Sequence, residues 1–141
     1  MHGTIVDHYE VLLICRMGVM SKHRVLISGS TIAQDKELIN KLRKSAVILT
    51  NTENALTRSI VGSETVDLIL FEISKNNASE LKIIKKIKTD FPEMTILLID
   101  GNGDSELTAE AFSCGVRDAF RKPYKGSLIA ERVNAILSAN K

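Results

Sequence analysis

The chain is poor in aromatic residues and cysteine. Trp is absent and aromatic residues make up 4% of the 141 residues, so a hydrophobic core has to be built from Ile, Leu, Val and Ala. Such a core is typical of a parallel sheet covered by helices. The two cysteines, Cys15 and Cys114, are too few for a disulfide framework or a metal site of their own. This indicates a reducing compartment, and we expect a cytoplasmic protein.

Long hydrophobic runs and strong net charge are also missing. No uncharged apolar run reaches the roughly 18 residues that a membrane span needs. The apolar run 11–15 follows Asp7 and Glu10, where a secretory signal would carry positive charge. The net charge of +2 is too small to argue for nucleic acid or a membrane surface as a partner. We therefore expect neither of these partners for this domain.

Five apolar runs have the length of strands. The first four are nearly continuous in Val, Ile and Leu, which is typical of strands buried on both faces. They lie at residues 25–28 (VLIS), 46–50 (AVILT), 66–73 (VDLILFEI) and 95–100 (TILLID), and a weaker run lies at 118–121 (DAFR).

Segments with helical periodicity follow each strand. We predict helices over residues 31–44, 53–61, 79–90, 105–113 and 125–139. Pro92 ends the third helix, because the residue before a proline is disfavoured in helical conformation. Ser30 or Thr31 is a candidate N-cap of the first helix, and Asp104 or Ser105 of the fourth.

Alternating strands and helices predict a doubly wound α/β domain with a five-stranded parallel sheet, helices on both faces and the flavodoxin-like strand order 2-1-3-4-5. We place this domain at residues 22–141. Residues 1–21 are then expected to be an N-terminal extension, which is a disordered segment, an extra element or residues upstream of the true start. In this fold, ligands bind beyond the carboxyl ends of the first and third strands. That rule points to the residues after position 28, to Glu72 and to Lys122.

The strand VDLILFEI and the stretch CGVRDAFRKPY at residues 114–124 carry a family resemblance. In its order of elements, and in Gly115 standing seven residues before Lys122-Pro123, the chain resembles a bacterial response-regulator receiver domain of the CheY-like superfamily. The resemblance covers residues 24–137 and implies a role in two-component or phosphorelay signal transduction. It also implies that the Lys122-Pro123 peptide bond is cis.

Most positions that serve phosphorylation in that family carry different chemistry here. By resemblance, the acidic pair that holds Mg²⁺ falls on Gly29 and Ser30, and the phosphate-accepting aspartate falls on Glu72. The switch hydroxyl falls on Asp100 and the switch aromatic on Ala119, while the phosphate-pairing Lys122 and the following Pro123 are retained. Since Mg²⁺ is usually held by carboxylates and phosphate oxygens, we expect weak or absent Mg²⁺ binding and no useful phosphorylation. The resemblance is thus to a degenerate receiver without enzymatic activity.

Glu72 has three interpretations. It is a drifted residue at a dead site, or a phosphate mimic whose carboxylate pairs with Lys122, or a residual acceptor or metal ligand together with Asp100. An unpaired lysine in a cleft is costly, which favours an ion pair between Glu72 and Lys122.

Two other segments offer weaker sites. Residues 28–31 (SGST) could cradle a small anion or a nucleotide phosphate with backbone N–H groups, as flavodoxin-like modules do. Residues 100–104 (DGNGD) suggest a calcium loop, but the glutamate that would complete one is missing at the required spacing, so a plain loop is favoured.

We expect the domain to act by protein–protein interaction. The resemblance implies a docking face formed by the fourth helix, fifth strand and fifth helix, with Phe112, Phe120, Arg121 and Tyr124 as candidate contacts. A histidine kinase, an output domain or a second copy of the chain is the expected partner. The alternatives are a conventional phosphorelay receiver with weak Mg²⁺ binding, a small-anion-binding module, or one domain of a longer regulator.

Overall fold

Five parallel strands form the centre of the molecule. The structure is a computed structural model that describes residues 23–73, 78–101, 103 and 105–139. Its strands are β1 (His23–Ser28), β2 (Ala46–Asn51), β3 (Leu68–Ile73), β4 (Thr95–Asp100) and β5 (Asp118–Arg121). Their order in the sheet is β2-β1-β3-β4-β5, as the sequence predicted.

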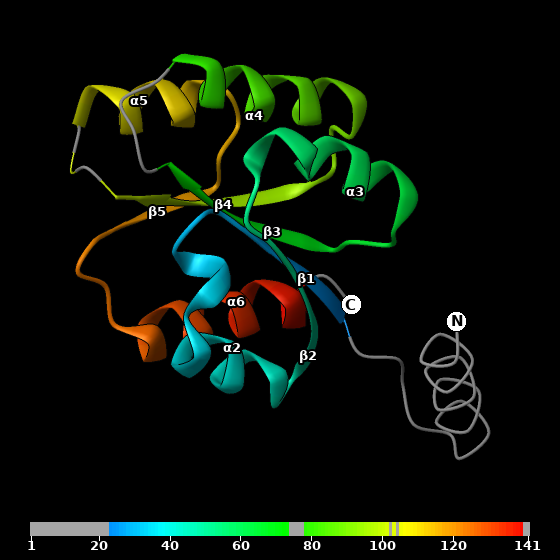
Figure 1. The fold of residues 1–141 in the computed structure, drawn as a ribbon, viewed down its shortest axis with the longest axis vertical. Coiled ribbons are helices and arrows are strands. Elements are labelled where there is room, and N and C mark those ends of the chain that lie inside the picture. The colour runs from blue at the N-terminus through cyan, green and yellow to red at the C-terminus, as the bar shows by residue number, and fades with distance from the viewer. Residues whose placement is uncertain (1–22, 74–77, 102, 104, 140–141) are drawn as a thin grey trace.

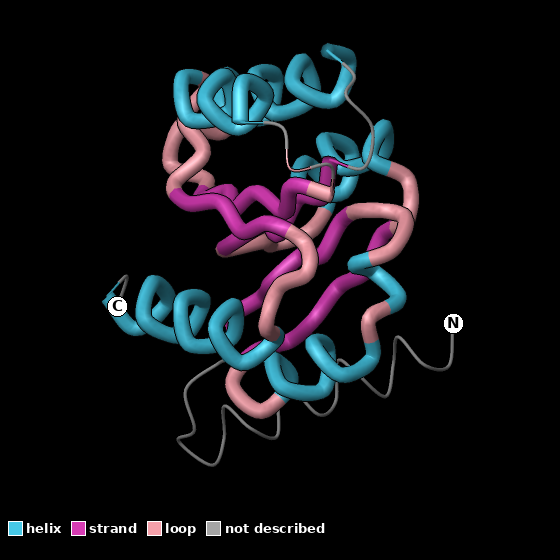
Figure 2. The backbone as a smooth tube through the Cα atoms, turned by 90° about the vertical axis from the view of Figure 1, so that its left-hand side faces the viewer, coloured by secondary structure: helices cyan, strands magenta, loops and turns pink. Residues whose placement is uncertain are grey.

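Helices cover both faces of this sheet (Figures 1 and 2). Helices α2 (Lys36–Arg43) and α6 (Gly126–Ala139) lie on one face. Helices α3 (Thr57–Ser63), α4 (Ala78–Asp90) and α5 (Ser105–Ser113) lie on the other. Two short 3₁₀ turns, η1 (Ile32–Gln34) and η2 (Asn54–Leu56), precede α2 and α3.

The core is split by the sheet into two apolar layers. Alternate residues of β3 point to opposite faces, so Leu68 and Leu70 join the layer under α2 and α6, whereas Ile69 and Phe71 join the layer under α3, α4 and α5. Both layers consist mainly of Ile, Leu, Val and Ala. Aliphatic side chains on both sides of the parallel sheet therefore form the core, in which aromatic residues are scarce.

The first predicted helix is wrong at its start. Residues 31–44 do not form one helix, because η1 and α2 are separate and α2 begins after Asp35. The Asp35 carboxylate accepts a hydrogen bond from the N–H of Leu38 at 3.1 Å and is the N-cap. Neither Ser30 nor Thr31 caps this helix, because Asp35 occupies the N-cap position. The Thr31 side chain bonds to Glu72 instead.

Other differences are smaller. The predicted helix 53–61 is divided into η2 and α3, and the helix predicted over 125–139 begins at Gly126. β2 was expected to be buried on both faces, but it is an edge strand, and Val47 is 39% exposed. Asp104 lies outside the described residues, as does the side chain of Ser105, so their predicted capping role remains a prediction.

The N-terminal extension was predicted at residues 1–21, and it lies outside the described residues, which begin at His23. Cys15 lies in that segment, while Cys114 is a free, half-buried thiol at the end of α5. No helix in the described part of the chain is long and apolar enough to cross a membrane.

Candidate functional site

Three segments meet at the carboxyl edge of the sheet. β1 ends at Ser28, β3 at Ile73 and β5 at Arg121, and parallel strands bring these ends together. Backbone hydrogen bonds hold the following loops in place: the N–H of Gly29 donates to Asn51 O at 2.9 Å, and the N–H of Lys122 donates to Asp100 O at 3.1 Å.

The Glu72 carboxylate is the centre of this edge. Glu72 is 0% exposed, and its Oε2 forms an ion pair with Lys122 Nζ. The Thr31 hydroxyl also donates to Oε2, and it accepts a hydrogen bond from Lys122 Nζ. Oε1 accepts from the backbone N–H of Thr31 at 2.9 Å and of Ile32 at 3.2 Å. The predicted ion pair is confirmed, and each carboxylate oxygen has two donors.

These contacts keep Glu72 ionised. Burial raises the pKa of its carboxyl, but the hydrogen bonds from Lys122, from the Thr31 side chain and from the N–H groups of Thr31 and Ile32 together outweigh burial. The pKa of Glu72 therefore lies below its ordinary value. A buried negative charge is tolerated because donors surround it.

Gly29 makes room for this side chain. Its φ is +150°, a conformation that residues with a side chain rarely adopt. A Cβ atom at this position would collide with Cβ and Oε1 of Glu72 and would lie 3.0 Å from Cγ2 of Ile32. Because an acidic residue at position 29 would need the space that Glu72 fills, the two positions are sterically linked. Ser30 is exposed.

A polar network fixes the backbone around Glu72. The Asn54 side-chain amide donates to the backbone oxygen of Glu72 at 2.8 Å and to Glu80 Oε2 at 2.6 Å. The buried Ser28 hydroxyl donates to Asn54 Oδ1 at 2.9 Å and lies 2.7 Å from the Thr57 hydroxyl. The sequence analysis missed this network, although polar residues in otherwise apolar strand ends, such as Ser28, are the signal that could have revealed it.

Asp100 does not share a site with Glu72. Asp100 follows Ile96 and Leu98 into the layer under α5, whereas Glu72 follows Leu68 and Leu70 into the opposite layer. Its Oδ1 accepts from the N–H of Gly103 and its Oδ2 from the Thr108 hydroxyl, each at 2.9 Å. The predicted shared metal site of Glu72 and Asp100 is wrong for this reason, and Asp100 instead stabilises the start of α5.

The segment after β5 closes the site from the other side. The Lys122-Pro123 peptide bond is cis, as the resemblance implied. The Tyr124 hydroxyl donates to Asp35 Oδ2. Burial and the neighbouring Asp35 and Glu72 raise the pKa of Tyr124 well above its ordinary value. Thr31, Asp35, Lys122, Pro123 and Tyr124 line an open hollow of about 540 Å³ beside the ion pair.

The four residues predicted for a docking face lie in different surroundings. Phe112 on α5 is 45% exposed, and Arg121 at the end of the edge strand β5 is also exposed. Phe120 and Tyr124 are partly buried and pack against the core layer under α2 and α6. Ala119 is half-buried against the opposite layer, where it offers only a methyl group. The structure therefore leaves Phe112 and Arg121 most available.

The described residues do not fit a Mg²⁺ site. Magnesium requires several oxygen ligands in near-octahedral geometry. Among the described residues, Glu72 is the carboxylate that Lys122 pairs with, and both its oxygens already accept hydrogen bonds. Within the described ranges, no group of three His, Cys, Asp or Glu residues could hold a metal ion.

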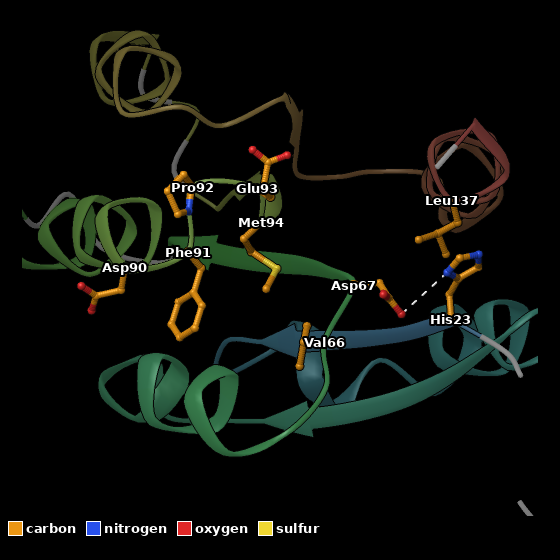
Figure 3. Close-up of a pocket in the computed structure, with 9 residues that line it drawn as sticks. All are labelled: His23, Val66, Asp67, Asp90, Phe91, Pro92, Glu93, Met94 and Leu137. Carbon is orange, nitrogen blue, oxygen red and sulfur yellow. Dashed lines mark ion pairs between the residues drawn. The ribbon is translucent and has the colours of Figure 1, made fainter. Parts of the chain in front are cut away.

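A second hollow of about 520 Å³ lies at the opposite edge of the sheet (Figure 3). There, His23 at the start of β1 faces Asp67 just before β3, with 3.7 Å between Nδ1 and Oδ2. The remaining lining residues are Val66, Asp90, Phe91, Pro92, Glu93, Met94 and Leu137. This hollow is remote from Glu72 and shares no residue with its contacts.

Comparison with known proteins gives structural neighbours only. No protein-family model and no curated protein matches the chain. A CheY-like response regulator receiver domain protein from Methanospirillum hungatei is similar, with a TM-score of 0.75 and 18% identity over 84% of this chain and 96% of that one. A response regulator from Thermotoga maritima has a TM-score of 0.74 and 19% identity, over 83% and 98%.

The orphan response regulator HP1043 of H. pylori has a TM-score of 0.71 and 23% identity over 80% of this chain and 94% of that one. The chain has the fold of a response-regulator receiver domain. In this receiver fold, Glu72 stands at the carboxyl end of the central strand β3, and Lys122 follows β5. At these levels of identity the likeness establishes the fold and leaves the function to be argued from the site.

Proposed function

We propose that this chain is a degenerate receiver module of two-component or phosphorelay signalling, which acts by binding a protein partner and does not pass through an aspartyl-phosphate cycle. The observation that carries the proposal is that both oxygens of the Glu72 carboxylate accept hydrogen bonds from Lys122, Thr31 and Ile32 of the same chain. A carboxylate that accepts a phosphoryl group needs a free oxygen in line with the phosphorus. Both oxygens of Glu72 are already occupied.

The same contacts favour Glu72 as a fixed mimic of a phosphoryl group. Its carboxylate supplies a permanent negative charge to Lys122, whereas a phosphoryl group would come and go. Ala119 has no side chain large enough to change position between two states. In this proposal the module presents one constant surface, is not an enzyme, and works in the cytoplasm.

A nuclear magnetic resonance titration tests this proposal. The backbone amides of Gly29, Glu72 and Lys122 are followed while Mg²⁺ is added, and then while beryllofluoride, a phosphoryl analogue, is added with Mg²⁺. We expect no saturable shift at millimolar concentrations, because the crevice offers no free carboxylate oxygen. Localised, saturable shifts at these three amides would instead support a conventional phosphorelay receiver.

The proposed docking face consists of α5, β5 and α6, with a histidine kinase, an output protein or a second copy as partner. Phe112 supports it as a large apolar side chain that is 45% exposed on α5. If the chain dimerises through this face, Phe112→Asp should raise the dimer dissociation constant at least about tenfold. Analytical ultracentrifugation measures this constant, and Leu56→Asp, 50% exposed on η2, is the matched control. Equal effects of both variants would reject this face.

A further inference from the structure

The crevice at Glu72 is complementary to an anion. Four donor groups converge on it: the Lys122 ammonium, the Thr31 hydroxyl and the backbone N–H groups of Thr31 and Ile32. The nearby carboxylates accept hydrogen bonds from other groups. Asp35 accepts from Leu38 and Tyr124, and Asp100 accepts from Gly103 and from Thr108 of α5. The charges and hydrogen-bond donors therefore favour a negative group and offer little to a cation.

The backbone that carries the donors is held in place by hydrogen bonds other than those to Glu72. Thr31 lies between β1 and η1, where the Gly29 N–H bonds to Asn51 O and the Ala33 N–H bonds to Gly29 O at 3.3 Å. The backbone of Lys122, which follows β5, is fixed by its own hydrogen bond to Asp100 O. Backbone N–H groups that are already in position bind a ligand with little loss of conformational entropy.

We propose that this crevice is a receptor for a single carboxylate-sized anion, that the Glu72 side chain is its resident ligand, and that a free small carboxylate binds there when that side chain is removed. The proposal rests on the same Glu72–Lys122 pair as the proposed function, but it concerns the ligand that the site prefers and not the signalling role.

The shape of the crevice specifies the size of the ligand. Glu72→Ala removes one methylene group and one carboxylate, which together have the heavy atoms of acetate. Glu72 is 0% exposed, so the space it leaves is enclosed by protein. Ile32 and the backbone of Gly29 form the wall beside Oε1. Acetate should therefore fit, formate should bind more weakly, and the branched pivalate ion should be excluded.

The experiment is a chemical rescue of the purified Glu72→Ala chain. Its thermal unfolding is followed in increasing sodium acetate, with the ionic strength held constant by sodium chloride. We expect the Tm to rise saturably, by roughly 3–6 °C at an acetate concentration far above its dissociation constant. In the same sample, the amide resonances of Thr31 and Ile32 should shift with the same midpoint. Magnesium chloride should have no effect beyond ionic strength.

Two variants serve as controls. Leu70→Ala opens a buried apolar space on the same face of β3 but contains no donor set, so acetate should not change its Tm. Glu72→Ala combined with Lys122→Met keeps the space and removes the cation. The affinity of this double variant for acetate should be at least about tenfold lower than that of Glu72→Ala. Acetate stabilisation that is equal in Glu72→Ala and Leu70→Ala, or pivalate as effective as acetate, would overturn the proposal.

The unmodified chain provides a second test if Glu72→Ala does not fold. The amide shifts of Thr31 and Ile32 should follow the titration of the Glu72 carboxyl between pH 2 and 6, because protonation weakens both hydrogen bonds. Amides that do not respond to this titration would overturn the receptor geometry. A Mg²⁺ or beryllofluoride response of the unmodified chain would count against the proposed function and leave acetate rescue of the variant to be decided separately.

Discussion

At the scale of single residues, the buried charge of Glu72 depends on its partner Lys122. The Glu72 carboxylate is 0% exposed, whereas the Lys122 side chain is 29% exposed. Removing one partner of a buried ion pair leaves an uncompensated charge, which is strongly destabilising. We expect Lys122→Met to lower the free energy of unfolding by about 2–3 kcal/mol, a value reduced from the fully buried case because water reaches the lysine.

Urea denaturation of four chains measures this coupling: the unmodified chain, Lys122→Met, Glu72→Leu and the double variant. The double variant should lose less than the sum of the two single losses, because neither charge then remains unpaired. Lys125→Met, an exposed lysine three residues along the chain, is the control and should change stability by less than about 0.5 kcal/mol. Strictly additive losses would show that the two charges do not interact.

The sequence was sufficient to predict this pair but not its surroundings. Glu72 and Lys122 followed from the positions of a buried strand and of a Lys-Pro dipeptide. The role of the Thr31 hydroxyl and of the Ile32 N–H did not follow, because the hydroxyl was predicted to cap a helix and a backbone N–H group is common to almost every residue. Residues 28–31 were predicted to be able to cradle an external anion with backbone N–H groups. Thr31 is the residue of this segment whose N–H bonds to a carboxylate, and that carboxylate is the Glu72 side chain of the chain itself.

At the scale of elements, the turn between β1 and η1 depends on Gly29. A side chain there would adopt an unfavourable φ of +150° and would also collide with Glu72. Gly103 provides a matched comparison, because its φ is +67° but no atom lies within 4 Å of the Cβ that it would carry. We expect Gly103→Ala to cost about 1 kcal/mol through backbone conformation alone. Gly29→Ala adds steric overlap in a packed site and should cost about 3 kcal/mol.

Thermal and urea unfolding of both variants measures this difference. Equal losses in the two variants would mean that the turn relaxes freely and that Glu72 does not restrict position 29. Glu72 should also lose contacts in Gly29→Ala, so the amide resonances of Thr31 and Ile32 should shift in this variant. In Gly103→Ala these two resonances should stay unchanged.

The boundaries of the elements were predicted well where a strong signal stood alone. The run TILLID and the helix 105–113 were placed at the bounds that the structure has. The first helix failed because two capping signals compete, and Asp35 accepts the hydrogen bond of Leu38 while the Thr31 side chain turns to Glu72. A contact between residues 41 positions apart is invisible to a local pattern.

At the scale of the whole molecule, the fold followed from composition and periodicity because the central strands are buried on both faces. β3 and β4 consist largely of aliphatic residues, and all six residues of each strand are buried. The predicted strand order placed β2 at the edge of the sheet. Its apolar sequence nevertheless led to the wrong prediction that it is buried on both faces. An edge strand is half solvated whatever its residues are, because only one neighbour pairs with it.

The stability of the whole domain should depend on acid in part through the buried carboxyl group of Glu72. The pKa of Glu72 is lower in the folded chain than in the unfolded one, where it is about 4.3. The folded state thus binds the proton less tightly. The stabilisation from ionised Glu72 is complete above the unfolded pKa and is lost as the pH falls through the folded pKa.

A comparison with Glu72→Gln isolates this contribution from the other carboxyl groups. The difference in the free energy of unfolding between the unmodified chain and Glu72→Gln should be constant from pH 5 to 8. Below pH 4 it should shrink by at most about 1.4 kcal/mol per pH unit, until the folded pKa is passed. Urea denaturation at closely spaced pH values measures this curve. A difference that stays constant down to pH 2 would contradict a lowered pKa, because protonation of Glu72 would then cost the folded state nothing. A difference that grows on acidification would also contradict it, because protonation of Glu72 would then stabilise the folded state.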